Sequence, residues 1–348
     1  MKVGLAGYGC ITPLGGTPAE LWGKIAAGQR VEPTEIVNPE SGRRYIGATV
    51  PAATTAHLAR EPRLRRASAI SAIAAAAGQA AIDQSGLDFT AGKSARLALV
   101  FAVSSGGVQY TRRFYEQVVK QGANAASPML FPETVYNAPA SHLAAMLGVD
   151  GATYTLVGDG TVGLQAVTFG AQMLALGDAD HVLVVAAEEL DWILLEAHRD
   201  WRLTRDGANA GALLAEGAAA VLLSRDAPAG TLVLPEGRSF VTRAEAFAAM
   251  DGALGDLAPG GAVDLIVSGG NGTWADAAIN AALAHHFPGE AATRIVPKEH
   301  VGEALGAGAL LQVVLAAAGL EELQRHRALI AAVGWNQQAA AAVLERAG

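Results

Sequence analysis

Short apolar runs alternate with longer segments of helical pattern along this chain. Leu97 to Val103 and His181 to Ala187 are apolar at nearly every position, which is typical of strands buried on both faces of a sheet. A helix is expected at Ala19 to Ala27, because Thr17 can cap it and Pro18 suits its first position. Strands that alternate with helices predict an α/β protein with mostly parallel sheets.

Other segments extend the same pattern to the end of the chain. Helices are expected at Leu64 to Ser85, Gly107 to Gln121, His142 to Leu147, Thr161 to Leu176, Thr242 to Gly255, Asp276 to His286 and Gly306 to Gly319. Strands are expected at Val3 to Gly7, Tyr154 to Val157, Ala218 to Ser224, Leu232 to Leu234, Leu265 to Ser268, Ile295 to Pro297 and Ala328 to Gly334. With no linker or low-complexity segment between these elements, residues 1–225 and 226–348 are expected to form two halves of one compact unit.

Composition narrows the classes of function. Of the 348 residues, 51% are hydrophobic and 17% are charged, which favours a globular chain with a sizeable core. The formal net charge is -8, and basic residues form no block beyond Arg63, Arg65 and Arg66, so nucleic-acid binding has little electrostatic support. A single cysteine, Cys10, rules out an internal disulfide and fits a reduced cytoplasmic setting.

Membrane and metal-binding roles are not indicated either. Ala67 to Ile82 is apolar, but two serines and a glutamine within it favour a buried helix over a membrane span. The eight histidines are scattered, and the adjacent pair His285 and His286 cannot share one helical face. We therefore expect no metal and no cofactor.

Eight segments form an ordered pattern over nearly the whole chain, more specific in the first half than in the second. They are Gly7 to Gly28, Phe131 to Gly148, Tyr154 to Val167, Gly177 to Leu190, Ala215 to Leu223, Val267 to Thr273, Pro297 to Gly308 and Ala332 to Ala340. In order and character they resemble the glycine-rich start, the nucleophile turn, the histidine segments and the terminal gate of β-ketoacyl synthases of the thiolase superfamily.

The resemblance implies a thiolase-like duplicated α/β/α/β/α layered fold with two mixed five-stranded sheets. Buried helices should lie between the sheets in such a fold. Ala67 to Ala81 and Thr161 to Leu176 are the best candidates, because their small residues permit close packing and they lack a polar face.

The residues that carry the family's chemistry are replaced in this chain. In the family, a cysteine at a strand-to-helix turn holds the acyl chain as a thioester, and two histidines assist loss of carbon dioxide. Here the cysteine position falls on Gly160 and the histidine positions fall on Asn271 and Glu303, whereas Lys298 matches the family's lysine. Glycine cannot form a thioester, and an ionised glutamate would repel an enolate. These three losses predict that the chain does not catalyse condensation, and Cys10 is expected to be a small buried residue.

Several polar residues near these positions have two interpretations. Lys298 pairs with Glu303 or Glu188, or it is a surface lysine. Asp159 holds the glycine turn by local hydrogen bonds, or it is a carboxylate catalyst for another reaction. Glu188 and its neighbour Glu189 follow a buried strand and are expected to be structural.

Two further segments are expected to lack a catalytic role. His142 is interpreted as a hydrogen-bonded core or interface histidine and not as a ligand. Trp335, Asn336 and Gln337 are bulky where the family has small gate residues, so we expect this loop to have lost its gating role.

Three functions compete for this chain. The first is a chain-length factor, which pairs with an active ketosynthase and shapes the tunnel for a chain carried on acyl carrier protein. The segments FPETVYNAPASHL, YTLVGDGT and AAEELDW look most like the chain-length factors of aryl polyene systems. The second is an acyltransferase, thioesterase or malonyl decarboxylase that uses Asp159, Asn271 or Glu303. The third is a homodimeric binding or scaffold protein.

The resemblance also implies which surface meets a partner. In this superfamily the strand before the nucleophile helix pairs across the dimer, so Ala152 to Val157 should lie at the interface. In chain-length factors the helix after a Ser-Gly turn crosses the interface and closes the acyl tunnel. Its counterpart carries two sets of neighbouring side chains, Val108, Thr111 and Tyr115 in one set and Tyr110 and Phe114 in the other.

Overall fold

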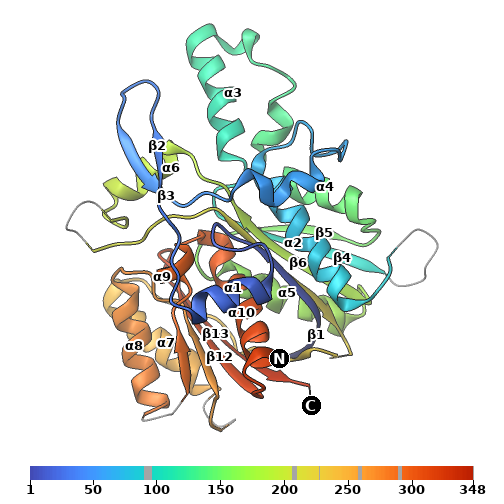
Figure 1. Ribbon diagram of the computed structural model, residues 1–348, viewed down its shortest axis with the longest axis vertical. Helices are drawn as coiled ribbons and strands as arrows, with labels where there is room; N and C mark the ends of the chain where they lie inside the picture. The colour runs from blue at the N-terminus through green and yellow to red at the C-terminus, as the bar shows by residue number, and fades with distance from the viewer. Residues whose placement is uncertain (90–95, 206–209, 227, 258–260, 289–291, 348) are drawn as a thin grey trace.

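Two sheets with the same plan form the framework of the protein. The computed structural model describes residues 1–89, 96–205, 210–226, 228–257, 261–288 and 292–347 (Figure 1). The first sheet has the strand order β5-β4-β6-β7-β1 and the second the order β11-β10-β12-β13-β8. Their bounds are β1 (Lys2–Ile11), β4 (Leu97–Val103), β5 (Thr153–Val157), β6 (His181–Glu188), β7 (Gly217–Ser224), β8 (Gly230–Val233), β10 (Leu265–Ser268), β11 (Thr293–Ile295), β12 (Arg327–Val333) and β13 (Gln338–Arg346).

The repeated plan extends to strand direction. In the first sheet, β4 runs parallel to β5 and β6, and β7 runs antiparallel to β6 and β1. In the second, β10 runs parallel to β11 and β12, and β13 runs antiparallel to β12 and β8. The predicted boundary after residue 225 lies between β7 and β8, where the first copy of this order ends and the second begins. This duplicated plan is the one that the resemblance implied.

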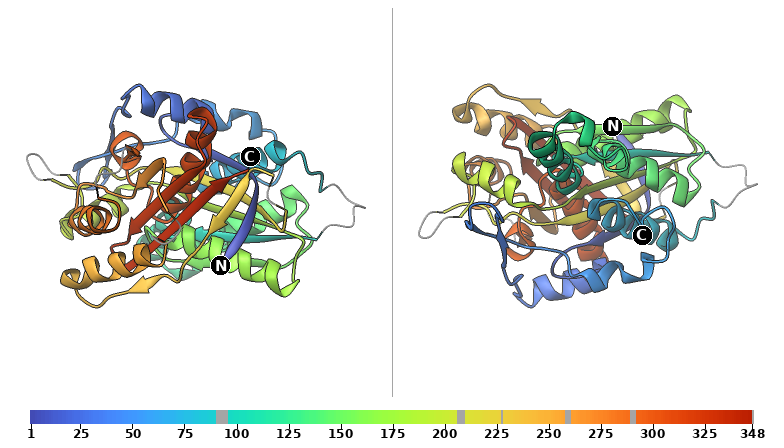
Figure 2. Two further views of the ribbon diagram at one scale, coloured as in Figure 1. Left: turned by 90° about the horizontal axis from the view of Figure 1, so that it is seen from below. Right: turned by 90° about the horizontal axis from the view of Figure 1, so that it is seen from above.

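The two sheets are joined at one edge, which the sequence did not indicate. Residues Lys2–Leu5 of β1 pair antiparallel with Gly230–Val233 of β8, so the strands form one continuous hydrogen-bonded network. Figure 2 shows this pairing from below, with β1 in blue beside β8 in yellow. Small additional strands are the hairpin of β2 (Thr34–Val37) and β3 (Arg44–Gly47), and β9 (Arg238–Ser239) on β13.

Helices cover both faces of this framework. Their bounds are α1 (Pro18–Ala26), α2 (Ala69–Ser85), α3 (Val108–Gln121), α4 (Ala138–Leu147), α5 (Val162–Leu176), α6 (Trp192–Asp200), α7 (Ala246–Gly255), α8 (Ala275–His286), α9 (Lys298–Val301) and α10 (Gly308–Glu322). Short 3-10 turns lie at η1 (Ala52–Leu58), η2 (Ala123–Ala125), η3 (Phe131–Thr134), η4 (Arg243–Glu245) and η6 (Leu305–Ala307). The predicted cap of α1 is confirmed, because the Thr17 hydroxyl accepts the backbone N–H of Glu20 at 3.2 Å.

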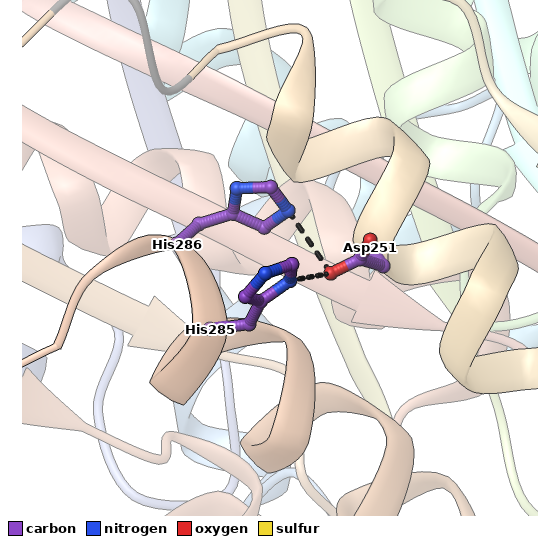
Figure 3. A group of neighbouring side chains, drawn as sticks. All are labelled: Asp251, His285 and His286. Carbon is purple, nitrogen blue, oxygen red and sulfur yellow. Dashed lines mark hydrogen bonds and ion pairs between the residues drawn. The ribbon is translucent and has the colours of Figure 1, made fainter.

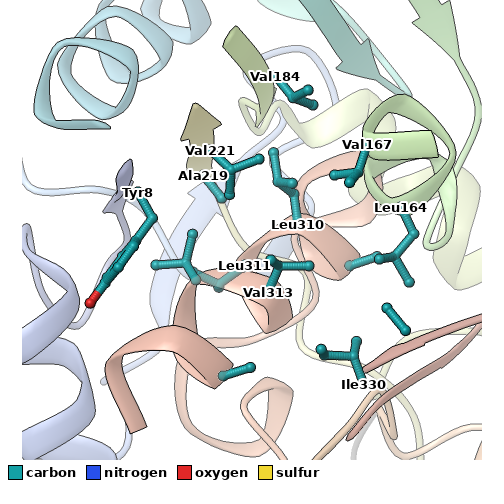
Figure 4. Close-up of a cluster of buried hydrophobic side chains, with 14 of the residues drawn as sticks. Tyr8, Leu164, Val167, Val184, Ala219, Val221, Leu310, Leu311, Val313 and Ile330 are labelled. Atoms are coloured by element: carbon teal, nitrogen blue, oxygen red, sulfur yellow. The ribbon is translucent and has the colours of Figure 1, made fainter. Parts of the chain in front are cut away.

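The layer between the sheets consists of α5 and α10. A methyl group at Gly163 of α5 would lie 2.7 Å from the backbone nitrogen of Leu310, so glycine permits close contact between these two helices. Their apolar side chains interdigitate with those of both sheets in one core (Figure 4), including Leu164, Val167, Leu310, Leu311 and Val313 from the helices and Val184, Val221 and Ile330 from the strands.

The outer faces carry different helices. α2 and α4 cover the first sheet, and α7 and α8 cover the second. The expectation that Ala67 to Ala81 lies between the sheets is therefore wrong, and α10 takes that place beside α5. The alternate residues Leu183, Val185 and Ala187 of β6 face α2 instead of the central layer. The small residues of α2 permit close packing on either face of a sheet, so their pattern does not identify the layer.

Two sequence expectations about buried segments can be checked directly. Cys10 is fully buried in β1, and burial raises the pKa of its thiol. Within the described residues, one helical stretch, Leu305–Glu322, has the length and hydropathy of a membrane span, but 89% of it is buried inside the protein. It includes α10, so its apolar character reflects a place in the core.

Candidate functional site

The predicted nucleophile position lies at the turn between β5 and α5. Gly160 is buried there, and a methyl group on it would lie 3.5 Å from the Cα of Gly334 and 3.9 Å from the Nζ of Lys298. These are ordinary van der Waals distances, so a cysteine side chain could begin at this position without a clash at Cβ. The missing thiol is therefore a loss of chemistry and not a consequence of backbone crowding.

Three other residues that the sequence analysis aligned with family site positions lie together beside Gly160. Asn271 and Glu303 are the expected replacements of the histidines, and Lys298 is the expected family lysine. The ammonium of Lys298 lies 2.7 Å from Oε2 of Glu303, and the Asn271 side-chain amide donates to the same oxygen at 2.8 Å. Lys298, Glu303 and Asn271 are only 6%, 3% and 7% exposed. We call these three residues the buried cluster. Its existence confirms the ion-pair interpretation of Lys298 and excludes its interpretation as a surface lysine.

Hydrogen bonds inside the buried cluster engage the groups that could assist catalysis. The carboxylate of Glu303 neutralises the Lys298 charge, which would otherwise be available to stabilise an oxyanion. Asn271 donates to Glu303 through Nδ2, and its Oδ1 accepts the Thr273 hydroxyl at 2.6 Å. Both ends of the amide are thus engaged within the protein. In this geometry Asn271 and Glu303, which the sequence analysis aligned with the two family histidines, form an internal polar contact.

Asp159 has a different environment from the buried cluster. Its Oδ2 accepts the backbone N–H of Asn336 at 2.6 Å, while its buried Oδ1 has no hydrogen-bond partner among the described residues. Burial, with a smaller contribution from the Glu303 charge, raises the pKa of Asp159 to about 6. The contact with Asn336 agrees with a structural role at the turn, and the raised pKa keeps a catalytic role open.

Asp159 lines a pocket of about 710 Å³ whose described lining does not include Gly160, Asn271, Lys298 or Glu303. Trp335 separates the two regions, because its ring lines the pocket and its Nε1 donates to the Thr273 hydroxyl at 3.1 Å. The pocket is lined by Ser104, Ser105, Tyr136, Asp159, Leu194, His198, Trp201, Leu203, Arg243, Leu305, Trp335 and Asn336. A ligand in this pocket would meet Asp159 but would lie outside the buried cluster.

The sequence reasoning missed His198, which lies on α6. Its ring packs against Trp201 and Trp335, with ring centroids 5.1 and 5.5 Å away, and its Nδ1 lies 2.8 Å from the carbonyl oxygen of Leu194. Burial lowers the pKa of His198, which favours the neutral imidazole. The spacing of Leu194, His198 and Trp201 places them on one helical face, and that was the signal available in the sequence.

Two buried glutamates hold the turn that precedes α3. Glu188 accepts the backbone N–H groups of Ser104 and Ser105, and burial raises its pKa to about 8. Glu189 accepts the backbone N–H of Gln109 at 2.9 Å and the Ser68 hydroxyl at 2.6 Å. The burial of both side chains and their hydrogen bonds to backbone groups agree with a structural role.

His142 also lies within hydrogen-bond distance of a neighbouring carboxylate. Its Nε2 lies 2.7 Å from Oε1 of Glu133, whose other oxygen accepts the Ser68 backbone N–H at 3.1 Å. This pairing agrees with a hydrogen-bonded histidine at the edge of the core. It connects the start of α2 with the segment that follows α3.

The helix expected to close an acyl tunnel projects from the body of the protein. Figure 1 shows α3 at the top, away from the two sheets, and none of its residues is fully buried. Tyr115 is 58% exposed, while the ring of Phe114 packs on that of Phe131 at 5.7 Å. Val108, Thr111 and Tyr110 are half-buried at its base. The described lining of the 710 Å³ pocket includes no residue of α3.

Apolar side chains gather on α3, on the segment after it and on β5. We call them the apolar surface, and its exposed members are Tyr115, Val119, Met129, Phe131, Val135, Tyr136, Tyr154 and Val157. In the described part of the chain, β5 pairs with β4 on one side and forms the outer edge of the first sheet. Exposed apolar groups and an open strand edge are typical of surfaces that bind another chain.

The structure corrects the sequence analysis at one pair of histidines. His285 Nδ1 and His286 Nε2 lie 2.6 and 3.0 Å from the same oxygen of Asp251, although these histidines are adjacent in sequence (Figure 3). They use different ring nitrogens, and α7 brings Asp251 within reach of both. The expectation that adjacent positions cannot contribute to one site neglected this third residue from another helix.

Comparisons with other sequences place these observations in a family. A model of the β-ketoacyl synthase N-terminal domain matches residues 1–229. The 3-oxoacyl-[acyl-carrier-protein] synthase 2 of Vibrio harveyi is 27% identical over 194 residues, which cover 54% of this chain and 46% of that protein. The protein of the same name from Coxiella burnetii is 24% identical over 241 residues, covering 64% and 57%. The matched segments thus span about half the length of these relatives.

Solved structures agree over the full chain. The ishigamide ketosynthase/chain length factor has a TM-score of 0.81 at 21% identity and covers 100% of this chain and 99% of its own. A ketosynthase (ApeO) in complex with its chain length factor (ApeC) from Xenorhabdus doucetiae has a TM-score of 0.82 at 16% identity, covering 99% and 98%. At these identities the likeness shows a thiolase-like ketosynthase fold. Because the family model matches more than half of the chain, this protein belongs to the β-ketoacyl synthase family.

Proposed function

We propose that this chain is a non-catalytic chain-length factor that pairs with an active β-ketoacyl-acyl carrier protein synthase. The observation that carries the proposal is the buried cluster beside Gly160, where Glu303 engages both Lys298 and Asn271 in place of catalytic groups. The partner subunit would supply the cysteine and histidines, and acyl carrier protein would deliver the growing chain. This subunit would shape the tunnel that receives it, in fatty acid or polyketide synthesis of the aryl polyene kind.

The apolar surface supports a partner of this kind. A helix without a fully buried residue has little tertiary packing of its own, and α3 would gain such packing against a second chain. Similar solved structures include a ketosynthase with its chain length factor and a ketosynthase bound to an acyl carrier protein, AntDE:AntF, with a TM-score of 0.80 at 17% identity. We infer a heterodimer in which β5 and α3 face the ketosynthase.

Co-purification tests the assembly directly. The chain is co-expressed with a tagged, catalytically intact ketosynthase from the same organism, and the eluate is analysed by size-exclusion chromatography with mass determination. We expect a one-to-one heterodimer, with an interface of more than roughly 2,000 Å² if it is obligate. A stable homodimer that ignores the ketosynthase would favour the scaffold function instead, and a monomer unchanged by the ketosynthase would contradict the assembly.

Intact-mass measurement tests the lack of catalysis. The isolated chain, incubated with acyl- and malonyl-acyl carrier protein, should gain no acyl group and yield no condensed product. The Gly160→Cys variant should fold, because Cβ meets no close atom there, and should still fail to condense malonyl units. In this variant the carbonyl and the enolate of the malonyl substrate would still lack the two histidines, because Asn271 and Glu303 stand at their positions. An acyl adduct on the unchanged chain would overturn this part of the proposal.

One observation favours the second candidate, an acyl-thioester enzyme. Asp159 faces the 710 Å³ pocket with a pKa near 6, which lies within the range useful for acid–base catalysis. Turnover of acyl or malonyl thioesters by the isolated chain, abolished in Asp159→Asn and retained in the exposed control Asp83→Asn, would support that function. We expect no turnover by any of the three proteins.

A further inference from the structure

Two helices on the outer face of the second sheet bring three metal-ligand side chains together. Asp251 comes from α7, and His285 and His286 form the last turn of α8. One ligand atom from each residue lies within 4.8 Å of the other two. Figure 3 shows both imidazole rings directed at one oxygen of Asp251. The arrangement therefore joins two helices at a single point.

One of the three ligand atoms in this group forms no hydrogen bond. Oδ1 of Asp251 is 2.6 Å from His285 Nδ1 and 3.0 Å from His286 Nε2, so two ring nitrogens share one oxygen. The contact from His285 is a hydrogen bond, whereas the buried Nε2 of His286 forms none with any described residue. A buried polar atom without a partner is costly in free energy. A cation among the three atoms would give each of them a partner.

The chemistry of the donors selects the kind of cation. Two imidazole nitrogens and one carboxylate oxygen suit Zn²⁺, whereas Mg²⁺ and Ca²⁺ take mainly oxygen ligands. The C-terminal end of α8 carries a partial negative charge that also favours a cation.

We propose that Asp251, His285 and His286 bind Zn²⁺ and thereby connect α7 to α8. Tetrahedral zinc with bonds of about 2.0 Å separates its ligand atoms by about 3.3 Å, so the present contacts need to open by less than 1 Å. His285 can make this movement, because its side chain is 63% exposed. Its exposure also leaves a fourth position open to water.

Zinc bound at this site would stabilise the folded protein and would take no part in the chemistry of the acyl chain. Figure 1 shows α7 and α8 at the lower left of the molecule, and α3 at its top. His286 is fixed beside Gly255, where a methyl group would lie 3.7 Å from Nε2, so both helices pack closely at this point. Bound zinc is expected to raise the melting temperature of the protein, by an amount that grows with the logarithm of the free zinc concentration above the dissociation constant.

The test uses the full chain without a histidine tag, treated with EDTA and dialysed. Titration calorimetry with ZnCl₂ should show one site per chain with micromolar affinity or tighter. Co²⁺ should give the visible absorption of a tetrahedral complex. The melting temperature should rise on addition of zinc and fall again on addition of EDTA. Absence of binding at 100 μM zinc would overturn the proposal.

Matched variants distinguish this site from adventitious binding. His285→Gln and Asp251→Asn should each weaken zinc binding at least tenfold and abolish the thermal shift, while both retain the circular dichroism spectrum of the parent. The control His57→Gln removes an exposed histidine outside the group and should change neither measurement. Equal affinity in all four proteins would place the zinc elsewhere and contradict the assignment. None of these measurements needs assembly with a ketosynthase. A negative result for zinc binding would therefore leave the proposed function untouched, and a negative result for assembly would leave the zinc site untouched.

Discussion

The side chains of the buried cluster and those of the apolar surface lie in opposite environments. Lys298 and Glu303 are 6% and 3% exposed and neutralise each other, with Asn271 as a second partner of the carboxylate. Tyr115 and Val119 on α3 are 58% and 82% exposed, and their apolar groups meet solvent. In the buried cluster Oε2 of Glu303 joins Lys298 and Asn271, and Oε1 has no hydrogen-bond partner among the described residues. On the apolar surface, apolar groups lie without a partner inside the chain.

This difference bears on what the chain needs from a second subunit. A catalytic site keeps polar groups available for substrate, whereas in the buried cluster the Lys298 ammonium and both ends of the Asn271 amide are engaged within the protein. Exposed apolar area, in contrast, gains about 25 cal/mol for each Å² that another surface covers. The Lys298 charge is thus paired within the single chain, while association would stabilise α3 and β5. The proposed partner-dependent, non-condensing subunit would account for both regions.

The largest effect is expected inside the buried cluster. Lys298→Met leaves the carboxylate of Glu303 buried without its charge partner, which should lower the free energy of unfolding by about 3–5 kcal/mol. The double variant Lys298→Met with Glu303→Leu should recover most of this loss, because no unpaired charge remains. Urea denaturation measures both values. If the single and double variants lose equal stability, packing and not charge pairing holds this region together.

The second effect concerns pH and Asp159. Its pKa rises from an ordinary value of 3.8 to about 6 in the folded protein, so the folded state binds the proton more tightly than the unfolded state. The free energy of unfolding should therefore fall as pH rises from about 4 to 6, and Asp159→Asn should remove up to about 3 kcal/mol of this fall. Urea denaturation at several pH values measures the difference. Parallel curves for the parent and this variant, as expected of the control Asp83→Asn, would disprove the shift.

A third effect should appear on the apolar surface alone. Val157→Lys at the edge strand β5 is expected to weaken assembly with the ketosynthase at least tenfold, or about 1.4 kcal/mol. The stability of the isolated chain should change by no more than about 0.5 kcal/mol, because Val157 is 55% exposed. The control Val241→Lys changes another exposed valine, in the second half of the chain. Surface-plasmon measurements that give equal affinities for both variants would remove β5 from the interface.

The sequence predicted most elements because their patterns are local. Leu97 to Val103 was recognised as a strand from its continuous apolar run, and both faces of β4 are indeed buried. The layer of α2 could not be read from its composition, since small residues pack on either side of a sheet. The extension of β1 to Ile11 depends on pairing with β7, which is distant in sequence.

For the candidate site, too, the sequence predicted the local features and not those that depend on contacts between distant segments. The resemblance singled out Gly160, Asn271, Glu303 and Lys298, each in a recognisable segment, and the fold brings these residues together. It could not show that Asn271 donates to Glu303, which depends on side-chain directions in the folded state. The group around Asp251 was missed because it joins two helices whose contact no local pattern encodes.

The last and smallest expected change concerns the length of the product and not stability. In the proposed pair, Val108 at the base of α3 would leave the near part of a tunnel open, while Tyr115, about two turns further along the same helical face, would act as its floor. Val108→Phe should therefore shorten the acyl products, and Tyr115→Ala should lengthen them. Both side chains are at least partly exposed in the single chain, so folding should tolerate either change. Mass spectrometry of the products gives the length distribution, and size-exclusion chromatography verifies that each heterodimer is intact. An unchanged distribution from intact heterodimers of both variants would show that α3 packs at the interface without setting the chain length.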